Sequence, residues 1–245
     1  MSAMDLGIAG RTAVVTGASR GIGKAVAAQL EAEGVRVVGV SRSSGIDVTR
    51  ADAGERVLEA AGGEVDILVN NAGMSEVKPL DELTDDDWHA HHELHVMAGM
   101  RLMKALAPGM AQRGWGRIVN VASSSGKRAS LTNAAYTVSK AGQLMLSRVF
   151  AEAYAGMGVL VNAVAPGPVA GDLWLKPGGL AEQYATAKGI SRDEMLAQQA
   201  AKVPLGRLAT EPEIASVIVF LCSEPASTVT GAAWSADGGI VPSFL

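Results

Sequence analysis

The sequence predicts one doubly wound α/β domain with about seven parallel strands and helices on both faces of the sheet. Short apolar runs that are typical of buried strands alternate with segments of helical composition along the whole chain. The first apolar run, Arg11 to Thr16, passes directly into a glycine-rich turn and then into a helical segment. The length of 245 residues suits one large domain with a substantial core. We therefore expect residues 1–245 to form a single domain.

Composition excludes several classes of function. The net charge of −4 argues against nucleic acid as the main partner. The single cysteine, Cys222, excludes an intramolecular disulfide, fits a reducing cytoplasm and is expected as a buried structural thiol. The N-terminus lacks the pattern of a signal peptide, and no apolar stretch has the length of a bilayer span. We expect a cytoplasmic protein without a membrane or nucleic-acid partner.

The order of expected elements follows the apolar pattern and the turn signals. A helix should begin at Thr84, where Thr84 and Asp87 form a capping-box pattern, and should run to about Arg113. The irregular segment at about 170–208 follows the carboxyl end of a strand, where substrate lids are usually found. We expect strands at 11–16, 35–40, 46–48, 64–69, 117–122, 159–165 and 232–235, and further helices at 24–34, 50–61 and 134–157 and from Thr210 onward.

The glycine-rich turn has the layout of a dinucleotide site. It reads Thr16-Gly17-Ala18-Ser19-Arg20-Gly21-Ile22-Gly23 and lies between a strand and a helix. Glycines let the backbone approach a pyrophosphate at the helix N-terminus, although the spacing G-x-x-x-G-x-G differs from the general fingerprint. The next strand ends in Ser41-Arg42, where NAD sites often carry an acid. Arg42 favours the 2′-phosphate of NADP, unless it is a solvated loop arginine.

The segment Ser123 to Lys140 contains candidate catalytic groups. Ser123 ends an apolar strand, and Tyr136 and Lys140 lie one helical turn apart. A neighbouring lysine cation lowers the pKa of a tyrosine, so Tyr136 is expected to act as a general acid or base on a substrate oxygen. Ser123 can hydrogen-bond the same oxygen. The alternative is an ordinary helix in which Tyr136 and Lys140 have no special role.

All four histidines fall in the long helix that begins at Thr84. They are His89, His91, His92 and His95. The one-turn spacing of His91 and His95 is compatible with a metal, but no carboxylate or cysteine completes a convincing site. We therefore expect no metal, and we interpret the four residues as a solvated helix face with one inward-facing histidine.

Taken together, these motifs resemble the short-chain dehydrogenase/reductase family, whose domain is of the Rossmann type. The resemblance covers nearly the whole chain, from about Leu6 to Gly239, and also includes Asn70-Asn71-Ala72-Gly73 and Pro166-Gly167. It implies that Tyr136 is the acid/base, that Ser123 orients the substrate oxygen, and that Lys140 binds the nicotinamide ribose. It further implies a homodimer or homotetramer. The implied cofactor-binding residues are Gly17, Ser19, Arg20, Gly21, Ile22, Gly23, Ser41, Arg42, Asp47, Val48, Asn71, Ala72, Gly73, Tyr136, Lys140, Pro166, Gly167 and Val169.

Two positions depart from the pattern of the family. Its fourth catalytic residue is an asparagine on the long helix, and His95 stands at that position, seven residues after Trp88. Histidine either keeps the associated proton relay, with titration near neutral pH, or breaks it. The second departure is Gly171, where the family often has a threonine that contacts the nicotinamide amide. Backbone groups such as those of Val169 are then expected to orient the cofactor.

The resulting hypothesis is an NADP(H)-dependent oxidoreductase that interconverts a secondary alcohol and a ketone. The alternatives are an NAD-dependent alcohol, diol or sugar dehydrogenase of the same family and a dinucleotide-binding protein without turnover. Lys127 and Arg128 favour an anionic substrate group, unless they are solvated, whereas Leu173, Trp174 and Leu175 favour a partly apolar pocket. The candidate substrates are therefore a 3-oxoacyl thioester, a sugar, a steroid and a diol.

Overall fold

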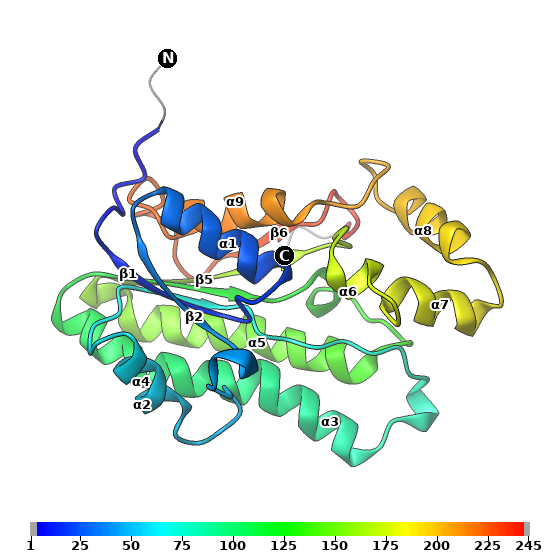
Figure 1. Ribbon diagram of the computed structural model, residues 1–245, viewed down its shortest axis with the longest axis horizontal. Coiled ribbons are helices and arrows are strands. Elements are labelled where there is room, and N and C mark those ends of the chain that lie inside the picture. The colour runs from blue at the N-terminus through cyan, green and yellow to red at the C-terminus, as the bar shows by residue number, and fades with distance from the viewer. Residues whose placement is uncertain (1–3, 243–245) are drawn as a thin grey trace.

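The computed structural model describes residues 4–242 and contains one parallel sheet between two layers of helices (Figure 1). The sheet has six strands in the order β2-β1-β3-β4-β5-β6. The strand order reverses at β1: β2 lies on one side of β1, and β3 to β6 follow on the other side. The predicted doubly wound α/β class is confirmed. The strands are β1 (Thr12–Thr16), β2 (Arg36–Val40), β3 (Ile67–Asn70), β4 (Gly116–Val121), β5 (Val159–Pro166) and β6 (Ala233–Ala236).

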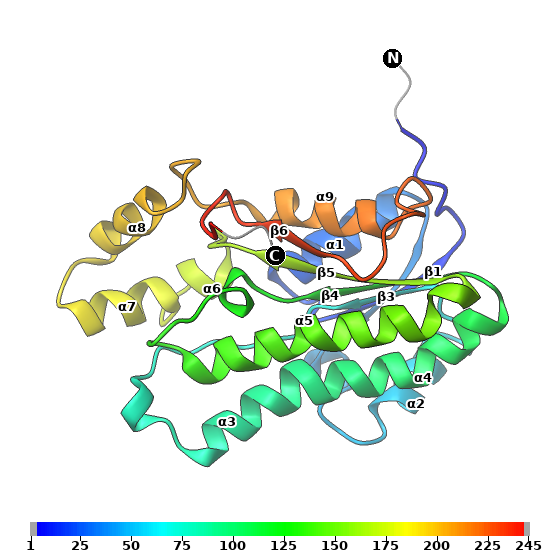
Figure 2. The same cartoon turned by 180° about the vertical axis from the view of Figure 1, so that it is seen from behind.

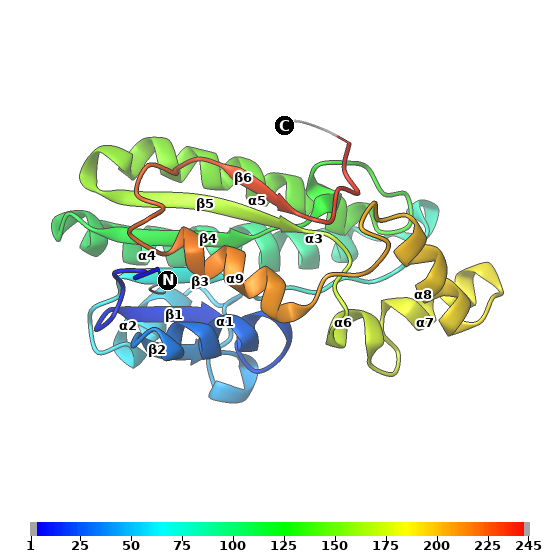
Figure 3. The ribbon, with the colours of Figure 1, turned by 90° about the horizontal axis from the view of Figure 1, so that it is seen from above.

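Two apolar clusters fasten the helices to the two faces of the sheet. One face is covered by α1 (Gly21–Ala32) and α9 (Glu211–Leu221), which lie side by side in Figures 1 and 3. The other face is covered by α2 (Ala53–Ala60), α4 (Ala98–Gln112) and α5 (Ala134–Tyr154). Residues of β1 alternate between the clusters, since Val14 packs with one and Ala13 and Val15 with the other. This two-sided burial explains why the strands read as continuous apolar runs.

The expected strand at 46–48 is not a strand, and this accounts for six strands where the sequence suggested about seven. Ile46 and Val48 are buried in the same core cluster as Val40. Between them, the Asp47 carboxylate accepts hydrogen bonds from the Thr49 amide (3.0 Å) and hydroxyl (2.7 Å). This local turn takes the place of pairing with a neighbouring strand. Ile46 and Val48, with the polar Asp47 between them, have the alternating pattern of a strand, but these residues pair with no other strand within residues 4–242.

The long helix is continuous but changes its winding at one place. The Thr84 cap and Asp87 form the predicted capping box at the start of α3 (Asp85–His92). A π-helical segment, Glu93–Met97, then connects α3 to α4. The helix ends before Gly114, which has a φ of +70° that favours glycine. A π-helical turn inside an α-helix often lies at a functional site, and His95 belongs to this turn.

The irregular segment after β5 extends beyond the carboxyl edge of the sheet. It carries the short helix α6 (Asp172–Leu175) and the helices α7 (Leu180–Lys188) and α8 (Arg192–Ala201). Figures 2 and 3 show α7 and α8 projecting sideways from the sheet. We call residues 170–208 the lid. No helix of residues 4–242 has the length and apolar character needed to cross a bilayer.

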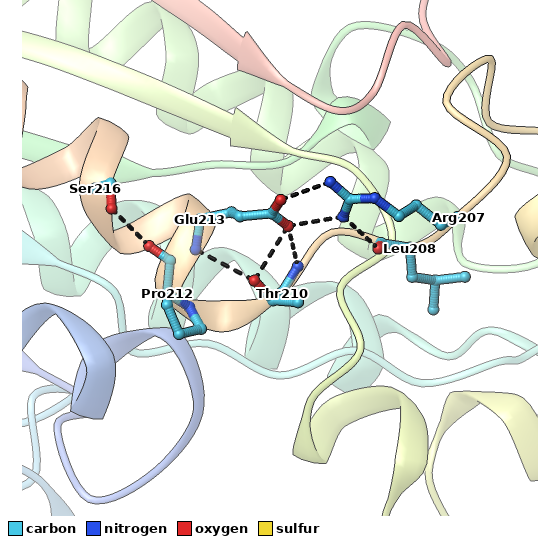
Figure 4. A network of polar contacts seen from close by, with 6 residues as sticks. All are labelled: Arg207, Leu208, Thr210, Pro212, Glu213 and Ser216. Carbon is cyan, nitrogen blue, oxygen red and sulfur yellow. Dashed lines mark hydrogen bonds and ion pairs between the residues drawn. The ribbon is translucent and has the colours of Figure 1, made fainter.

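The lid is tied to the start of α9 where it returns to the domain (Figure 4). Thr210 caps α9 in the predicted capping box with Glu213. The Arg207 guanidinium donates to both carboxylate oxygens of Glu213, at 2.6 and 2.8 Å. Arg207 lowers the pKa of Glu213 to about 2, with help from the Thr210 amide. The network fixes the carboxyl end of the lid, while its helices remain outside the core.

Candidate active site

Ser123, Tyr136 and Lys140 come together at the carboxyl edge of the sheet. Ser123 lies two residues after the end of β4, and Tyr136 lies in the first turn of α5. Ser123 and Lys140 are almost fully buried, and Tyr136 is partly buried. The Ser123 hydroxyl lies beside the Tyr136 phenol and favours its ionised form. The structure thus brings together the hydroxyl, the phenol and the ammonium that the sequence analysis singled out.

The expected lowering of the Tyr136 pKa by Lys140 is wrong. Burial raises the pKa of Tyr136 to about 12, and the Ser123 hydroxyl opposes this rise. The Lys140 ammonium lies 5.7 Å from the centre of the Tyr136 ring and is directed elsewhere. Tyr136 therefore carries its proton at neutral pH. A protonated phenol next to a serine hydroxyl is suited to donating a proton to a carbonyl oxygen.

Lys140 is held by two buried acceptors. Its Nζ donates to the Val121 carbonyl at 2.7 Å and to Gln143 Oε1 at 2.9 Å. Burial lowers the pKa of Lys140 to about 7, so the two acceptors do not compensate fully for desolvation. Gln143 was not among the predicted site residues. Its signal in the sequence is a polar residue three positions after Lys140, on the inward face of the helix.

His95 links the loop after β3 to the catalytic turn of α5. Its Nε2 accepts a hydrogen bond from the Met74 amide at 3.1 Å, and its Nδ1 lies 2.8 Å from Ser139 Oγ. The Ser139 hydroxyl donates its single proton to the Tyr136 carbonyl at 2.8 Å. Nδ1 must therefore carry the proton in the bond to Ser139. The His95 ring also lies 5.4 Å from the Tyr136 ring.

The expectation that His95 titrates near neutral pH is wrong. Desolvation, followed by repulsion from Lys140 and His91, lowers the pKa of His95 well below its usual value. His95 is 1% exposed, and both of its nitrogens have partners. It is a neutral imidazole in one fixed tautomer. Gly73 packs against it, since an added Cβ would lie 3.2 Å from Nε2.

The four histidines divide into two inward and two outward residues, where one inward histidine was expected. His91 is 5% exposed, its Nδ1 lies 2.9 Å from the Asp87 carbonyl, and its ring lies 5.7 Å from that of His95. His89 and His92 are exposed. The residues that the structure describes contain no group of three or more histidine, cysteine or acidic side chains arranged to hold a metal.

The glycine-rich turn forms a cradle that fits a dinucleotide pyrophosphate. Gly17 and Gly21 have φ angles of +68° and +62°, which favour glycine. A Cβ on Gly23 would collide with the Gly17 carbonyl, so the helix and the turn pack more closely than any side chain allows. No side chain caps the N-terminus of α1. Its first amides therefore remain available to an anion. Ser19, Arg20 and Ile22 lie in the same turn.

Thr16 and Asn71 hold this cradle in place. The Thr16 hydroxyl accepts hydrogen bonds from the Asn71 and Ala72 amides, both at 2.9 Å. The Asn71 side-chain amide donates to the Thr16 carbonyl at 2.9 Å. The side chain of Asn71 thus joins the ends of β1 and β3. Thr16 was not among the predicted site residues, although it directly precedes Gly17.

The residues assigned to the adenosine end lie around the end of β2. Arg20 and Arg42 are both exposed, as a phosphate-binding arginine must be before its ligand arrives. Ser41 caps a short 3₁₀ helix, Arg42–Ser44, in a capping box with Ser44. The Thr49 hydrogen bonds lower the pKa of Asp47, so its carboxylate is ionised and fixed. Val48 is buried beneath this corner.

The post-β5 loop places Gly171 against α9. A Cβ on Gly171 would collide with the Glu211 carboxylate, which also lies close to Gly21, so the flexible Glu211 side chain would have to move for a threonine to stand there. Gly167 is enclosed by fixed backbone, because an added Cβ would lie 2.8 Å from the Asp237 backbone. Pro166 ends β5, and Val169 forms an isolated parallel bridge with Ala209.

The structure removes one of the two cations proposed to favour an anionic substrate. The Lys127 ammonium donates to the Ala233 carbonyl at 2.6 Å and to the Ser235 hydroxyl at 2.9 Å. It therefore fastens the loop after β4 to β6. Arg128 remains exposed. On the other side of the site, Trp174 stacks on Tyr184, with ring centres 5.8 Å apart, and these residues bring aromatic surface from the lid.

Comparisons with known proteins agree with this geometry. Residues 44–241 match the family model described as enoyl-(acyl carrier protein) reductase. The chain is 36% identical to the 3-oxoacyl-[acyl-carrier-protein] reductase of Salmonella typhimurium, over 94% of this chain and 97% of that protein. The structure resembles L-sorbose reductase from Gluconobacter frateurii, complexed with NADPH and L-sorbose, with a TM-score of 0.87, 33% identity, and coverage of 98% and 100%.

A further solved structure has the same relation to this chain. It is a Beutenbergia cavernae protein described as an NAD(P)-dependent gluconate 5-dehydrogenase with bound NADP. The TM-score is 0.85 at 32% identity, with coverage of 98% of this chain and 100% of that one. These relatives support an NADP(H)-dependent oxidoreductase that acts on alcohol and carbonyl groups. The chain belongs to the short-chain dehydrogenase/reductase family.

Proposed function

We propose that the protein reduces a ketone to a secondary alcohol with NADPH, using Tyr136 as the proton donor. The observation that carries this proposal is that Ser123, Tyr136 and Lys140 come together in a fold whose glycine-rich turn suits a pyrophosphate. Because burial raises the pKa of Tyr136, the phenol holds a proton that it can donate to a carbonyl oxygen. The dinucleotide, when bound, supplies the hydride.

The side chains divide the remaining work among them. Ser123 donates a hydrogen bond to the substrate carbonyl oxygen and orients it toward the Tyr136 hydroxyl. The Tyr136 O–H then protonates that oxygen as negative charge develops on it. Lys140, with a pKa of about 7, shares its protons between Val121, Gln143 and the nicotinamide ribose.

In this proposal His95 is a positioning residue. It holds the Met74 loop on one side and, through Ser139, the backbone of Tyr136 on the other. Its neutral state and fixed tautomer argue against a role in moving protons. The π-helical turn places His95 where it can reach both partners. The asparagine of the family and the histidine of this chain would therefore meet the same need, an ordered helix turn behind Tyr136, by different contacts.

The residues around the adenosine end favour NADP(H) over NAD(H) in this proposal. Ser41 and Arg42 stand at the end of β2, with Arg20 in the preceding turn, so a 2′-phosphate would meet two exposed guanidinium groups and no acid on the β2 end. The competing proposals are an NAD-dependent dehydrogenase of alcohols, diols or sugars and a dinucleotide-binding protein without turnover. His95 and Gly171, which stand where the family has asparagine and often threonine, are the features that motivate the second.

A homodimer or homotetramer in the cytoplasm is part of the same proposal. Val138, Met145 and Val149 are each more than half exposed, and their spacing places them along one face of α5. Large apolar side chains gathered on one helix face are typical of an interface with another subunit. Sedimentation of the purified protein at micromolar concentration tests the assembly, and a monomer would contradict this part of the proposal.

The function is tested by two measurements on the wild-type protein. In the first, NADPH and NADH are titrated at matched salt, and much tighter NADPH binding is expected. In the second, the loss of NADPH absorbance is followed with a panel of neutral ketones and ketoses. Consumption of NADPH with at least one class of ketone supports the proposal. Binding of NADPH with no turnover across the panel would favour the non-catalytic competitor.

A further inference from the structure

A second tyrosine reaches the site from the lid. Tyr184 lies in α7, and, after burial, it is the second group that raises the pKa of Tyr136. The Thr132 hydroxyl donates to the Tyr184 oxygen at 3.4 Å. Thr132 lies four residues before Tyr136, at the entrance to α5. The tip of Tyr184 is therefore located at the mouth of the catalytic site.

The lid is fastened around this tyrosine by contacts with the rest of the domain. The Val77 amide donates to Gln183 Oε1 at 2.9 Å, next to Tyr184 in the chain. The Lys78 amide donates to the Thr132 carbonyl at 2.9 Å, so the same loop supports Thr132 as well. Trp174 stacks on the other side of the Tyr184 ring. A cleft of about 470 Å³ borders this junction and is lined by Val77, Pro79, Thr132 and Gln183 among others.

The hydrogen-bonding capacity of the reacting oxygen decides what Tyr184 can contact. A carbonyl oxygen has two lone pairs. Ser123 and Tyr136 already supply one donor to each in the proposed mechanism. The 3.4 Å contact with Thr132 joins two hydroxyls whose hydrogens rotate, so the Tyr184 O–H can turn from Thr132 toward a ligand. A donor from Tyr184 must therefore meet a different oxygen of the substrate.

We infer that Tyr184 is a specificity-determining residue that binds a second oxygen, next to the reacting carbonyl, and so selects neutral α-hydroxyketones such as ketoses. This inference rests on the proposed function and names the substrate class of that same site. The groups that can meet a substrate beside the pair are the phenols of Tyr136 and Tyr184 and the hydroxyls of Ser123 and Thr132, while Lys140 is engaged by Val121 and Gln143. Lys127, which could have bound an anionic group, is engaged by β6.

The test compares two ketones that differ by one hydroxyl, 3-hydroxybutan-2-one and butan-2-one. Wild type is expected to have the higher kcat/KM for the hydroxyketone. Tyr184→Phe should lower this kcat/KM five- to tenfold, the effect of losing one neutral hydrogen bond, and change that for butan-2-one less than twofold. Tyr154→Phe is the matched control, because Tyr154 stacks on Phe150 at the far end of α5. It should change neither value.

A binding measurement separates this inference from the proposed function. Calorimetric titration of butane-2,3-diol and butan-2-ol into the enzyme–NADPH complex requires no turnover. Tyr184→Phe should weaken binding of the diol five- to tenfold and leave binding of butan-2-ol unchanged. If Tyr184→Phe weakens binding of the diol alone while wild type reduces no ketone, the proposed function fails and the role of Tyr184 stands. Equal losses for both ligands, or no loss for either, would overturn the role of Tyr184 whatever the turnover.

Discussion

Replacing His95 by asparagine or glutamine separates its two hydrogen bonds. The asparagine amide ends near the position of the histidine Nδ1 and can reach Ser139, whereas the glutamine amide ends near Nε2 and can reach the Met74 amide. His95→Asn therefore keeps the contact that supports the Tyr136 backbone. His95→Gln keeps only the contact to the loop after β3. If His95 positions Tyr136 through Ser139, the two variants must differ in activity.

The size of the effect follows from burial. His95 and Ser139 are 1% and 4% exposed, whereas Met74 is 37% exposed, so water reaches the Met74 end of the chain of contacts more readily. His95→Gln leaves the buried Ser139 hydroxyl without this partner, which costs about 1–3 kcal/mol of stability, and His95→Asn, which frees the Met74 amide, should cost less. In His95→Gln the catalytic turn also loses support, and a small displacement of Tyr136 is expected to lower kcat by about tenfold or more. His95→Asn should retain kcat within about threefold.

The assays are urea unfolding and steady-state reduction of a ketone identified with wild type. His92→Asn on the same helix is the control, because His92 is exposed and should affect neither measurement. The pH profile of kcat between pH 6 and 9 should be the same in His95→Asn as in wild type, since His95 stays neutral. An equal loss of kcat in both variants, or an inflection that disappears with His95, would refute the positioning role.

The same histidine predicts how stability depends on acid. Burial lowers the pKa of His95 in the folded protein, while the unfolded chain titrates near 6.5. Below about pH 6.5 the unfolded state therefore binds more protons, and stability falls by up to about 1.4 kcal/mol per pH unit from this residue. His95→Asn should reduce this slope. A slope equal to that of wild type would mean that His95 is charged when folded.

The remaining predictions concern the cradle, the adenosine end and Lys140. Gly23→Ala should fold but lose NADPH binding, because the new methyl group collides with the Gly17 carbonyl; undiminished binding in a fluorescence titration would contradict the cradle. Arg42→Ala should weaken NADPH binding about tenfold and NADH binding little, since it loses a charge-assisted hydrogen bond; equal effects on both would argue for a solvated arginine. Because burial lowers the pKa of Lys140 to about 7, the unfolded state binds more protons above pH 7, and stability should rise by about 2 kcal/mol between pH 7 and 9. Urea unfolding of Lys140→Met should lack that rise, and a rise that persists would disprove the assignment.

The sequence predicted the fold well because its signals were local and mutually consistent. The apolar run before Gly17, the capping boxes at Thr84 and Thr210, and the strand before Pro166 each specify one element through short-range physics. The failure at Ile46 and Val48 has the same origin. Burial of two aliphatic side chains is common to a strand and to a turn that packs on the core, and only the Asp47–Thr49 hydrogen bonds distinguish them.

The sequence predicted which residues lie in the candidate site better than it predicted their pKa values. Spacing placed Tyr136 and Lys140 on one helix face, but the direction of the Lys140 ammonium depends on the Val121 carbonyl and Gln143. Spacing also cannot show that desolvation dominates the pKa of Tyr136.

Contacts between segments that are distant in the chain could not be predicted from spacing either. The tautomer of His95 follows from Ser139 and Met74, which lie 44 and 21 residues away along the chain. Likewise, Lys127 read as a free loop cation because its partners in β6 lie more than 100 residues later. These properties depend on tertiary packing, which no local pattern encodes.

The central claim is that the Tyr136 hydroxyl delivers the proton to the substrate oxygen. The most direct test is Tyr136→Phe, measured by NADPH consumption with a ketone that wild type reduces and by NADPH titration of the same preparation. The account predicts a loss of kcat of about 10²- to 10⁴-fold, the usual contribution of a general acid, with the affinity for NADPH preserved. A Tyr136→Phe protein that binds NADPH and reduces the ketone at the wild-type rate would contradict the mechanism.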